Sequence, residues 1–90
     1  MNTHLIEVFI ERNCRSCEEV LGVLGGVWDQ LGLSVKVYER HADKEIFLGR
    51  SVMVCPATFV DNRLAFYGSF SGEELLRYIK SQQSIIHNKE

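Results

Sequence analysis

The chain has 90 residues, of which 46% are hydrophobic, and a net charge of −2. This composition is enough for one hydrophobic core and too apolar for a disordered segment. Charges of both signs are interspersed, so no basic surface for nucleic acid and no polybasic patch for a membrane is predicted. No apolar run reaches membrane-spanning length and the first residues lack the pattern of a signal peptide, which predicts a cytoplasmic protein. We expect a single domain over residues 1–90, with residues 84–90 as a frayed tail.

The first half of the chain shows the spacing of a strand, a helix and a second strand. Leu5–Ile10 is apolar on both sides except for Glu7, which is typical of a strand covered on both faces. Arg15–Leu31 changes to helical spacing. Its apolar stripe consists of Val20, Leu24, Val27 and Leu31. Ser34–Glu39 then alternates like a strand with one more exposed face.

The second half predicts a short helix, a hairpin and a closing helix. Asp43 is expected to cap the short helix, which ends at Gly49. Ala57–Val60 and Leu64–Tyr67 form the hairpin, because Asp61-Asn62 between them tolerates the positive φ of a tight turn.

The last helix is marked at its start by two pairs of residues. Ser71 and Glu74 have the spacing of a capping box, and Phe70 and Leu75 that of a hydrophobic staple. The whole order, βαβαββα, predicts an α/β fold in which a four-stranded mixed sheet carries three helices on its two faces. The first two strands are expected to be parallel, joined by a right-handed crossover, with the hairpin as the antiparallel edge.

Cys14-Arg15-Ser16-Cys17 lies at the junction of the first strand and the first helix. Two thiols at this spacing reach each other across one turn, and the unpaired N–H groups of a helix N-terminus favour thiolate over thiol. Arg12 and Arg15 flank Cys14 and are expected to lower its pKa further. The total of three cysteines is too few, and odd, for a secreted disulfide scaffold, so the pair points to redox or metal chemistry.

The chain's one proline, Pro56, opens the predicted third strand. A strand, a CxxC, a helix and a later proline-led strand together resemble the thioredoxin superfamily, and most closely its small, glutaredoxin-sized members. The resemblance extends from Leu5 to about Ile79. It implies a thioredoxin-like fold and a thiol–disulfide oxidoreductase that reduces protein disulfides through a mixed-disulfide intermediate.

The resemblance also implies roles for individual residues. Cys14 matches the nucleophilic cysteine and Cys17 the resolving cysteine of the redox-active disulfide, which serves in place of a cofactor. Pro56 matches a cis-proline that shapes the groove for the target backbone, with Cys55 before it facing the cysteine sulfurs. Gly68 lies near the rim where partners and glutathione dock.

Four departures distinguish this chain from the family pattern. Asn13 replaces the usual Trp, Arg15-Ser16 is neither of the usual dipeptides, and Val8 stands where a buried acid is common. The fourth departure is the thiol of Cys55. It is either a small packing residue, a partner of Cys14 in an alternative disulfide, or the third sulfur of a metal site.

The predicted partners are protein disulfides, with thioredoxin reductase or glutathione as the electron donor, and a monomer is expected without nucleic-acid or membrane partners. No residue is assigned as a metal ligand in this main interpretation. The alternative is a thiolate metal carrier, or an iron–sulfur or zinc protein, using Cys14, Cys17 and possibly Cys55. Copper chaperones with a similar CxxC carry Met where this chain has Arg12, and a three-sulfur site needs a fourth ligand from elsewhere. A redox-inert binding module is disfavoured while both CxxC cysteines are present.

Overall fold

The computed structural model describes the backbone of residues 4–88 and the side chains of residues 4–26 and 32–82. The elements are β1 (Leu5–Ile10), α1 (Arg15–Leu31), β2 (Ser34–Glu39), α2 (Lys44–Gly49), β3 (Ala57–Val60), β4 (Arg63–Tyr67) and α3 (Gly72–Asn88). The predicted order βαβαββα is confirmed. Helix α3 is continuous to Asn88, and both the fraying from residue 84 and the single domain stay predictions. Within the described part of the chain, no helix is long and apolar enough to cross a membrane.

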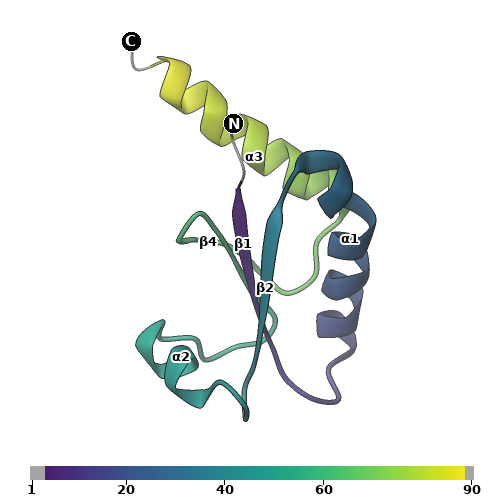
Figure 1. Ribbon diagram of the computed structural model, residues 1–90, viewed down its shortest axis with the longest axis vertical. Coiled ribbons are helices and arrows are strands. Elements are labelled where there is room, and N and C mark those ends of the chain that lie inside the picture. The colour runs from purple at the N-terminus through teal and green to yellow at the C-terminus, as the bar shows by residue number, and fades with distance from the viewer. Residues whose placement is uncertain (1–3, 89–90) are drawn as a thin grey trace.

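The four strands form one mixed sheet in the order β2-β1-β3-β4. Strand β1 is parallel to β2, and β4 returns antiparallel to β3, as predicted. The structure adds that β3 lies beside β1 and is antiparallel to it. Figure 1 shows α1 and α2 on opposite sides of the strands, with α3 across the end of the sheet near α1. The central strand β1 is therefore enclosed by helices on both faces.

Two hydrophobic clusters fill the two faces of the sheet. The α1–α3 core consists of Ile6, Val8, Val20, Leu24, Leu33, Val60, Phe70, Leu75 and Ile79. The α2 core consists of Phe9, Phe47, Val52 and Ala57. Because successive side chains of a strand point to opposite faces, β1 contributes to both cores. The predicted stripe of α1 is confirmed at Val20 and Leu24, while the side chains of Val27 and Leu31 lie outside the described residues.

The predicted turn and capping signals are confirmed at the hairpin and at α3. Asp61 and Asn62 have φ values of 49° and 75°, and β4 begins one residue before the predicted Leu64. At the start of α3, the Glu74 N–H donates to Ser71 Oγ at 3.1 Å and the Ser71 N–H donates to Glu74 Oε1 at 2.8 Å. This reciprocal pair is the capping box.

The prediction that the Asp43 side chain caps α2 is wrong. Asp43 occupies the N-cap position, but its side chain makes no capping hydrogen bond. Its carboxylate instead accepts the Glu39 N–H at 2.9 Å, and the Glu39 carboxylate accepts the Ala42 N–H at 3.0 Å. Asp side chains readily bond nearby backbone groups in turns, and here the turn after β2 takes the carboxylate from the helix. The turn that carries Arg40 is fixed as a result.

Candidate active site

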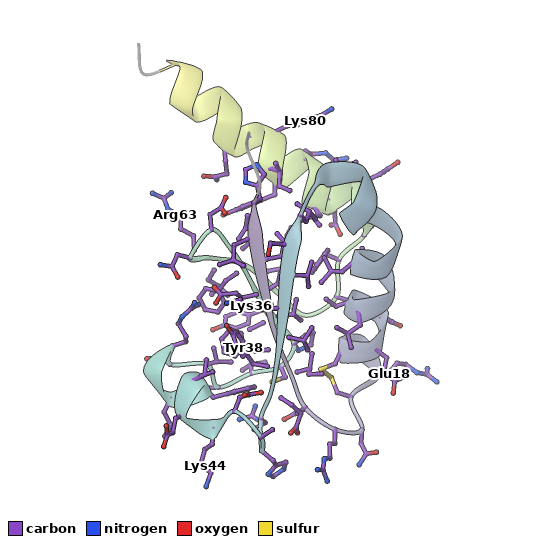
Figure 2. All side chains as sticks on the ribbon, in the orientation of Figure 1. Glu18, Lys36, Tyr38, Lys44, Arg63 and Lys80 are labelled. Carbon is purple, nitrogen blue, oxygen red and sulfur yellow. A yellow bond between two sulfur atoms is a disulfide. The ribbon has the colours of Figure 1, made fainter. Side chains whose placement is uncertain are left out.

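Cys14 and Cys17 form a disulfide at the beginning of α1, visible as a yellow bond in Figure 2. Helix α1 begins at Arg15, so Cys14 occupies the N-cap position and Cys17 is the third helical residue. The Cys17 N–H donates to Cys14 Sγ at 3.1 Å. A Ser or Asp at an N-cap accepts the same N–H with its oxygen. In the reduced protein this N–H and the positive end of the helix dipole therefore favour negative charge on Cys14.

The two sulfurs differ in accessibility. Cys14 is partly exposed, whereas Cys17 is 2% exposed. A large reactant reaches Cys14 first, because exchange requires direct contact with the attacking sulfur. The helix turn thus presents one cysteine to the outside and keeps the other beneath it.

Pro56 and Gly68 are brought together across the hairpin. The Cys55–Pro56 peptide bond is cis, and Pro56 is fully buried. Its carbonyl accepts the Gly68 N–H at 2.9 Å, and Gly68 has a φ of 81°. Ala57 pairs with Phe9 near the C-terminal end of β1. Pro56 therefore lies at the same end of the sheet as the loop that leads from β1 to Cys14. The binding roles of Pro56 and Gly68 stay predictions.

Cys55 is a free thiol packed against the α2 core. Its Sγ accepts a hydrogen bond from Arg40 Nη2 at 3.4 Å. Burial raises the pKa of the Cys55 thiol, and the Arg40 guanidinium partly opposes this rise. Among the described residues, no three or more His, Cys, Asp or Glu side chains are grouped so that they could hold a metal ion. Of the three interpretations of Cys55, the contacts favour the packing residue.

Arg12 and Arg15 are both exposed beside the disulfide. Arg12 Nε lies 3.9 Å from Glu39 Oε2, and because the Arg12 side chain is 74% exposed, this long ion pair contributes little. In the described part of the molecule, neither guanidinium makes a hydrogen bond to a cysteine sulfur. Any influence of these two residues on Cys14 is therefore Coulombic and screened by solvent, and their tuning role stays a prediction.

Sequence reasoning missed a buried charge cluster on the other face of the sheet. Val8 is buried in the α1–α3 core, as its apolar character predicts, but the neighbouring Glu7 is also buried, at 4% exposure. Glu7 accepts hydrogen bonds from Arg50 Nη2 at 2.6 Å and from the Tyr38 hydroxyl at 3.0 Å. The sequence did indicate this cluster, because Glu7 is the lone charge in a strand predicted to be covered on both faces, and such a charge requires a buried partner. The sequence did not indicate which cation supplies it.

A mixed sheet with a CxxC disulfide at the start of the helix after β1 and a proline opening β3 defines a thioredoxin-like protein. The comparison with protein families agrees. The model of the thioredoxin domain matches residues 4–80, and the chain belongs to this family. No curated protein matches the chain significantly.

Solved structures show the same fold. A malarial protein aligns with a TM-score of 0.79 and 16% identity, covering 89% of this chain and 97% of that one. Thioredoxin-2, a component of malaria parasite protein secretion machinery, aligns with a TM-score of 0.78 and 16% identity, covering 89% and 84%. Thioredoxin 1 from Thermosipho africanus aligns with a TM-score of 0.75 and 17% identity, covering 92% and 98%. At these identities the likeness concerns the fold.

Proposed function

We propose that this protein is a thiol–disulfide oxidoreductase that reduces disulfides in other proteins. The observation that carries the proposal is the Cys14–Cys17 disulfide at the N-terminus of α1, with Cys14 accessible and Cys17 buried beneath it. This arrangement supplies an activated attacking sulfur, access for a target and a second thiol within reach. Family membership supports the same chemistry.

The reaction proceeds in two exchanges. The Cys14 thiolate attacks one sulfur of the target disulfide, so that a Cys14–target bond forms while the target's S–S bond breaks and releases a thiolate. Cys17 then loses its proton and attacks the Cys14 sulfur, forming the Cys14–Cys17 bond and releasing the second target thiolate. The target gains two electrons and its thiolates take protons from solvent. Thioredoxin reductase or glutathione reduces the Cys14–Cys17 disulfide again.

The target backbone docks along the segment Met53–Pro56, which we name the proline loop. Met53 and Val54 expose 81% and 57% of their surface, which provides an apolar strip next to Pro56. Extended polypeptides bind such strips through side-chain contacts on either side of the reacting disulfide. We propose that the protein acts as a monomer in a reducing compartment such as the cytoplasm.

The first test is differential alkylation with mass spectrometry across a thiol/disulfide redox series, on metal-stripped protein. We expect a reversible Cys14–Cys17 disulfide whose midpoint places the protein on the scale from reductant to oxidant. Cys14→Ser is expected to abolish reduction of a protein disulfide, and Cys17→Ser to accumulate mixed disulfides with targets. The second variant is the matched control, because it removes one sulfur at the same helix end without removing the attacking thiol.

Other outcomes would change the assignment. Equal reductase activity in the wild type and Cys14→Ser would refute the mechanism. A Cys14–Cys55 bridge would make the third cysteine a reacting group. A cysteine pair that stays reduced at every potential, in a protein purified with stoichiometric metal, would replace the enzyme with the thiolate metal carrier.

A further inference from the structure

Arg40 connects three segments of the chain around the candidate active site. It is the first residue after β2, and its Nε donates to Glu11 Oε1 at 2.7 Å. Its Nη2 donates to the Met53 carbonyl at 3.1 Å and to Cys55 Sγ at 3.4 Å. Glu11 belongs to the stretch between β1 and Cys14, whereas Met53 and Cys55 belong to the proline loop. One guanidinium thus joins the loop that precedes the disulfide to the loop that precedes Pro56.

The guanidinium is held in place before any target arrives. The Arg40 N–H donates to the Ile10 carbonyl at 3.0 Å, which fixes its backbone to the end of β1. The guanidinium carbon lies 5.2 Å from the centroid of the Phe47 ring, a cation–π contact. The hydrogen bond to Glu11 raises the pKa of Arg40, and a guanidinium is in any case charged in proteins. A planar fork with fixed donors orients several acceptors at once.

We propose that Arg40 is a positioning residue that holds the proline loop against the loop leading to Cys14, and so fixes the edge on which a polypeptide target docks. This proposal rests on the proposed function. Its physical basis is that the exposed Met53 and Val54 have to be ordered in the complex. A loop that is already ordered in the free protein does not lose conformational entropy when the target binds. Loss of Arg40 is therefore expected to weaken target binding and to leave the exchange between sulfurs unchanged.

The test compares a polypeptide disulfide with a small one. Insulin is the polypeptide, with dithiothreitol as electron donor, and 5,5′-dithiobis(2-nitrobenzoate) is the small disulfide, which needs no docking edge. For Arg40→Gln we expect the KM for insulin to rise about tenfold. This is the loss of affinity that typically follows the removal of one charged hydrogen-bonding group. The kcat and the rate with the small disulfide stay within about twofold of the wild type.

Two further variants sharpen the comparison. Arg40→Lys keeps the charge but replaces the fork with a single ammonium, so its KM is expected to fall between those of Arg40→Gln and the wild type. Arg63→Gln is the control, because Arg63 is an exposed arginine at the opposite end of β4 from Gly68 and is expected to behave as wild type.

A second readout is independent of reductase activity. In the Cys14→Ser/Cys17→Ser background, Cys55 is the remaining thiol, and its alkylation rate against pH reports the Arg40 contact. Arg40→Gln is expected to move the midpoint of this profile to higher pH, because the cation that opposes the effect of burial is removed. An unchanged profile would show that Arg40 does not contact Cys55 in solution, and it would overturn the hold of Arg40 on this end of the proline loop.

The activity outcomes separate the two proposals. An unchanged KM for insulin in Arg40→Gln would overturn the positioning role and leave the oxidoreductase intact. Equal losses with insulin and with the small disulfide would also overturn it, because the defect would then lie in the exchange itself. Failure of the wild type to reduce either substrate would instead refute the proposed function.

Discussion

A single residue, Cys14, both caps the N-terminus of α1 and supplies the accessible sulfur. Its Sγ accepts the Cys17 N–H at 3.1 Å, the contact that a capping oxygen makes in other helices. The group that stabilises the start of the helix is therefore the group that the helix activates. The buried position of Cys17, three residues on, follows from the same turn, because that side chain falls on the inner face of α1.

At the other end of β1, Asp61 joins the N-terminal strand to the hairpin turn. Its carboxylate accepts His4 Nδ1–H at 2.6 Å and the Leu5 N–H at 2.9 Å. Burial by itself would raise the pKa of Asp61, but these two hydrogen bonds outweigh it and hold the pKa below its ordinary value of 3.8. The unfolded chain therefore binds the proton more readily than the folded one. The stabilisation is complete above the ordinary pKa and is lost as the pH falls through the lowered value.

We predict that Asp61→Asn reduces the free energy of unfolding at neutral pH and makes it less dependent on pH in the acid range. Asparagine tolerates the φ of 49° at this position, so the turn is retained and the loss is that of the carboxylate. Urea unfolding at pH 7 and in steps below about pH 4 measures the effect. A variant whose stability falls with acid as steeply as that of the wild type would contradict this role for Asp61.

Among the helices and strands, α2 depends most on tertiary contacts for its stability. It has six residues, and so short a helix does not persist without tertiary contacts. Phe47 anchors it in the α2 core, and Arg50 at its C-terminal end pairs with the buried Glu7 of β1. The Arg50 guanidinium carbon lies 4.9 Å from the ring centroid of Phe59. The pair is thus largely shielded from water on the Glu7 side, and loss of Arg50 alone leaves the Glu7 carboxylate charged in an apolar setting.

We predict that Arg50→Leu lowers the free energy of unfolding by about 3 kcal/mol, because the Glu7 carboxylate loses its cation while it stays buried. The double variant Glu7→Leu/Arg50→Leu is expected to be more stable than this single variant, since no uncompensated charge remains. A double-mutant cycle by urea unfolding measures the coupling. Additive losses from the two single variants would show that the ion pair does not attach α2 to the sheet.

At the scale of the whole molecule, the features predicted from sequence are those encoded locally. The strands, the helices and the capping box at Ser71 arise from spacings within a few residues. The CxxC is recognised as a candidate redox site because it lies between a predicted strand and a predicted helix. The contacts of Arg40 with Glu11 and of Arg50 with Glu7 join residues 29 and 43 positions apart. No local pattern specifies such partners, because they depend on the sheet order that brings the loops together. The prediction that the Asp43 side chain caps α2 was wrong for a related reason, because the helix N-terminus and the turn after β2 compete for the same carboxylate.

The two cores share the central strand, which makes the cooperativity of the whole molecule testable with a matched pair of substitutions. Val20 lies in the α1–α3 core and Val52 in the α2 core, with 0% and 7% exposure. Val20→Ala and Val52→Ala each remove the same two methyl groups and are each expected to cost about 2 kcal/mol. Because β1 is packed from both sides, each loss should appear as one shifted urea transition and lower the hydrogen-exchange protection of the β1 amides.

The result that would contradict a single cooperative unit is a biphasic transition in Val52→Ala alone, with early exchange confined to α2 and its flanking loops. The α2 core would then open separately from the α1–α3 core. Since the proline loop lies between α2 and β3, such opening would also release the segment Met53–Pro56 while α1 keeps Cys14 in place. A single transition in both variants requires instead that the proline loop and the helix carrying Cys14 lose their structure together.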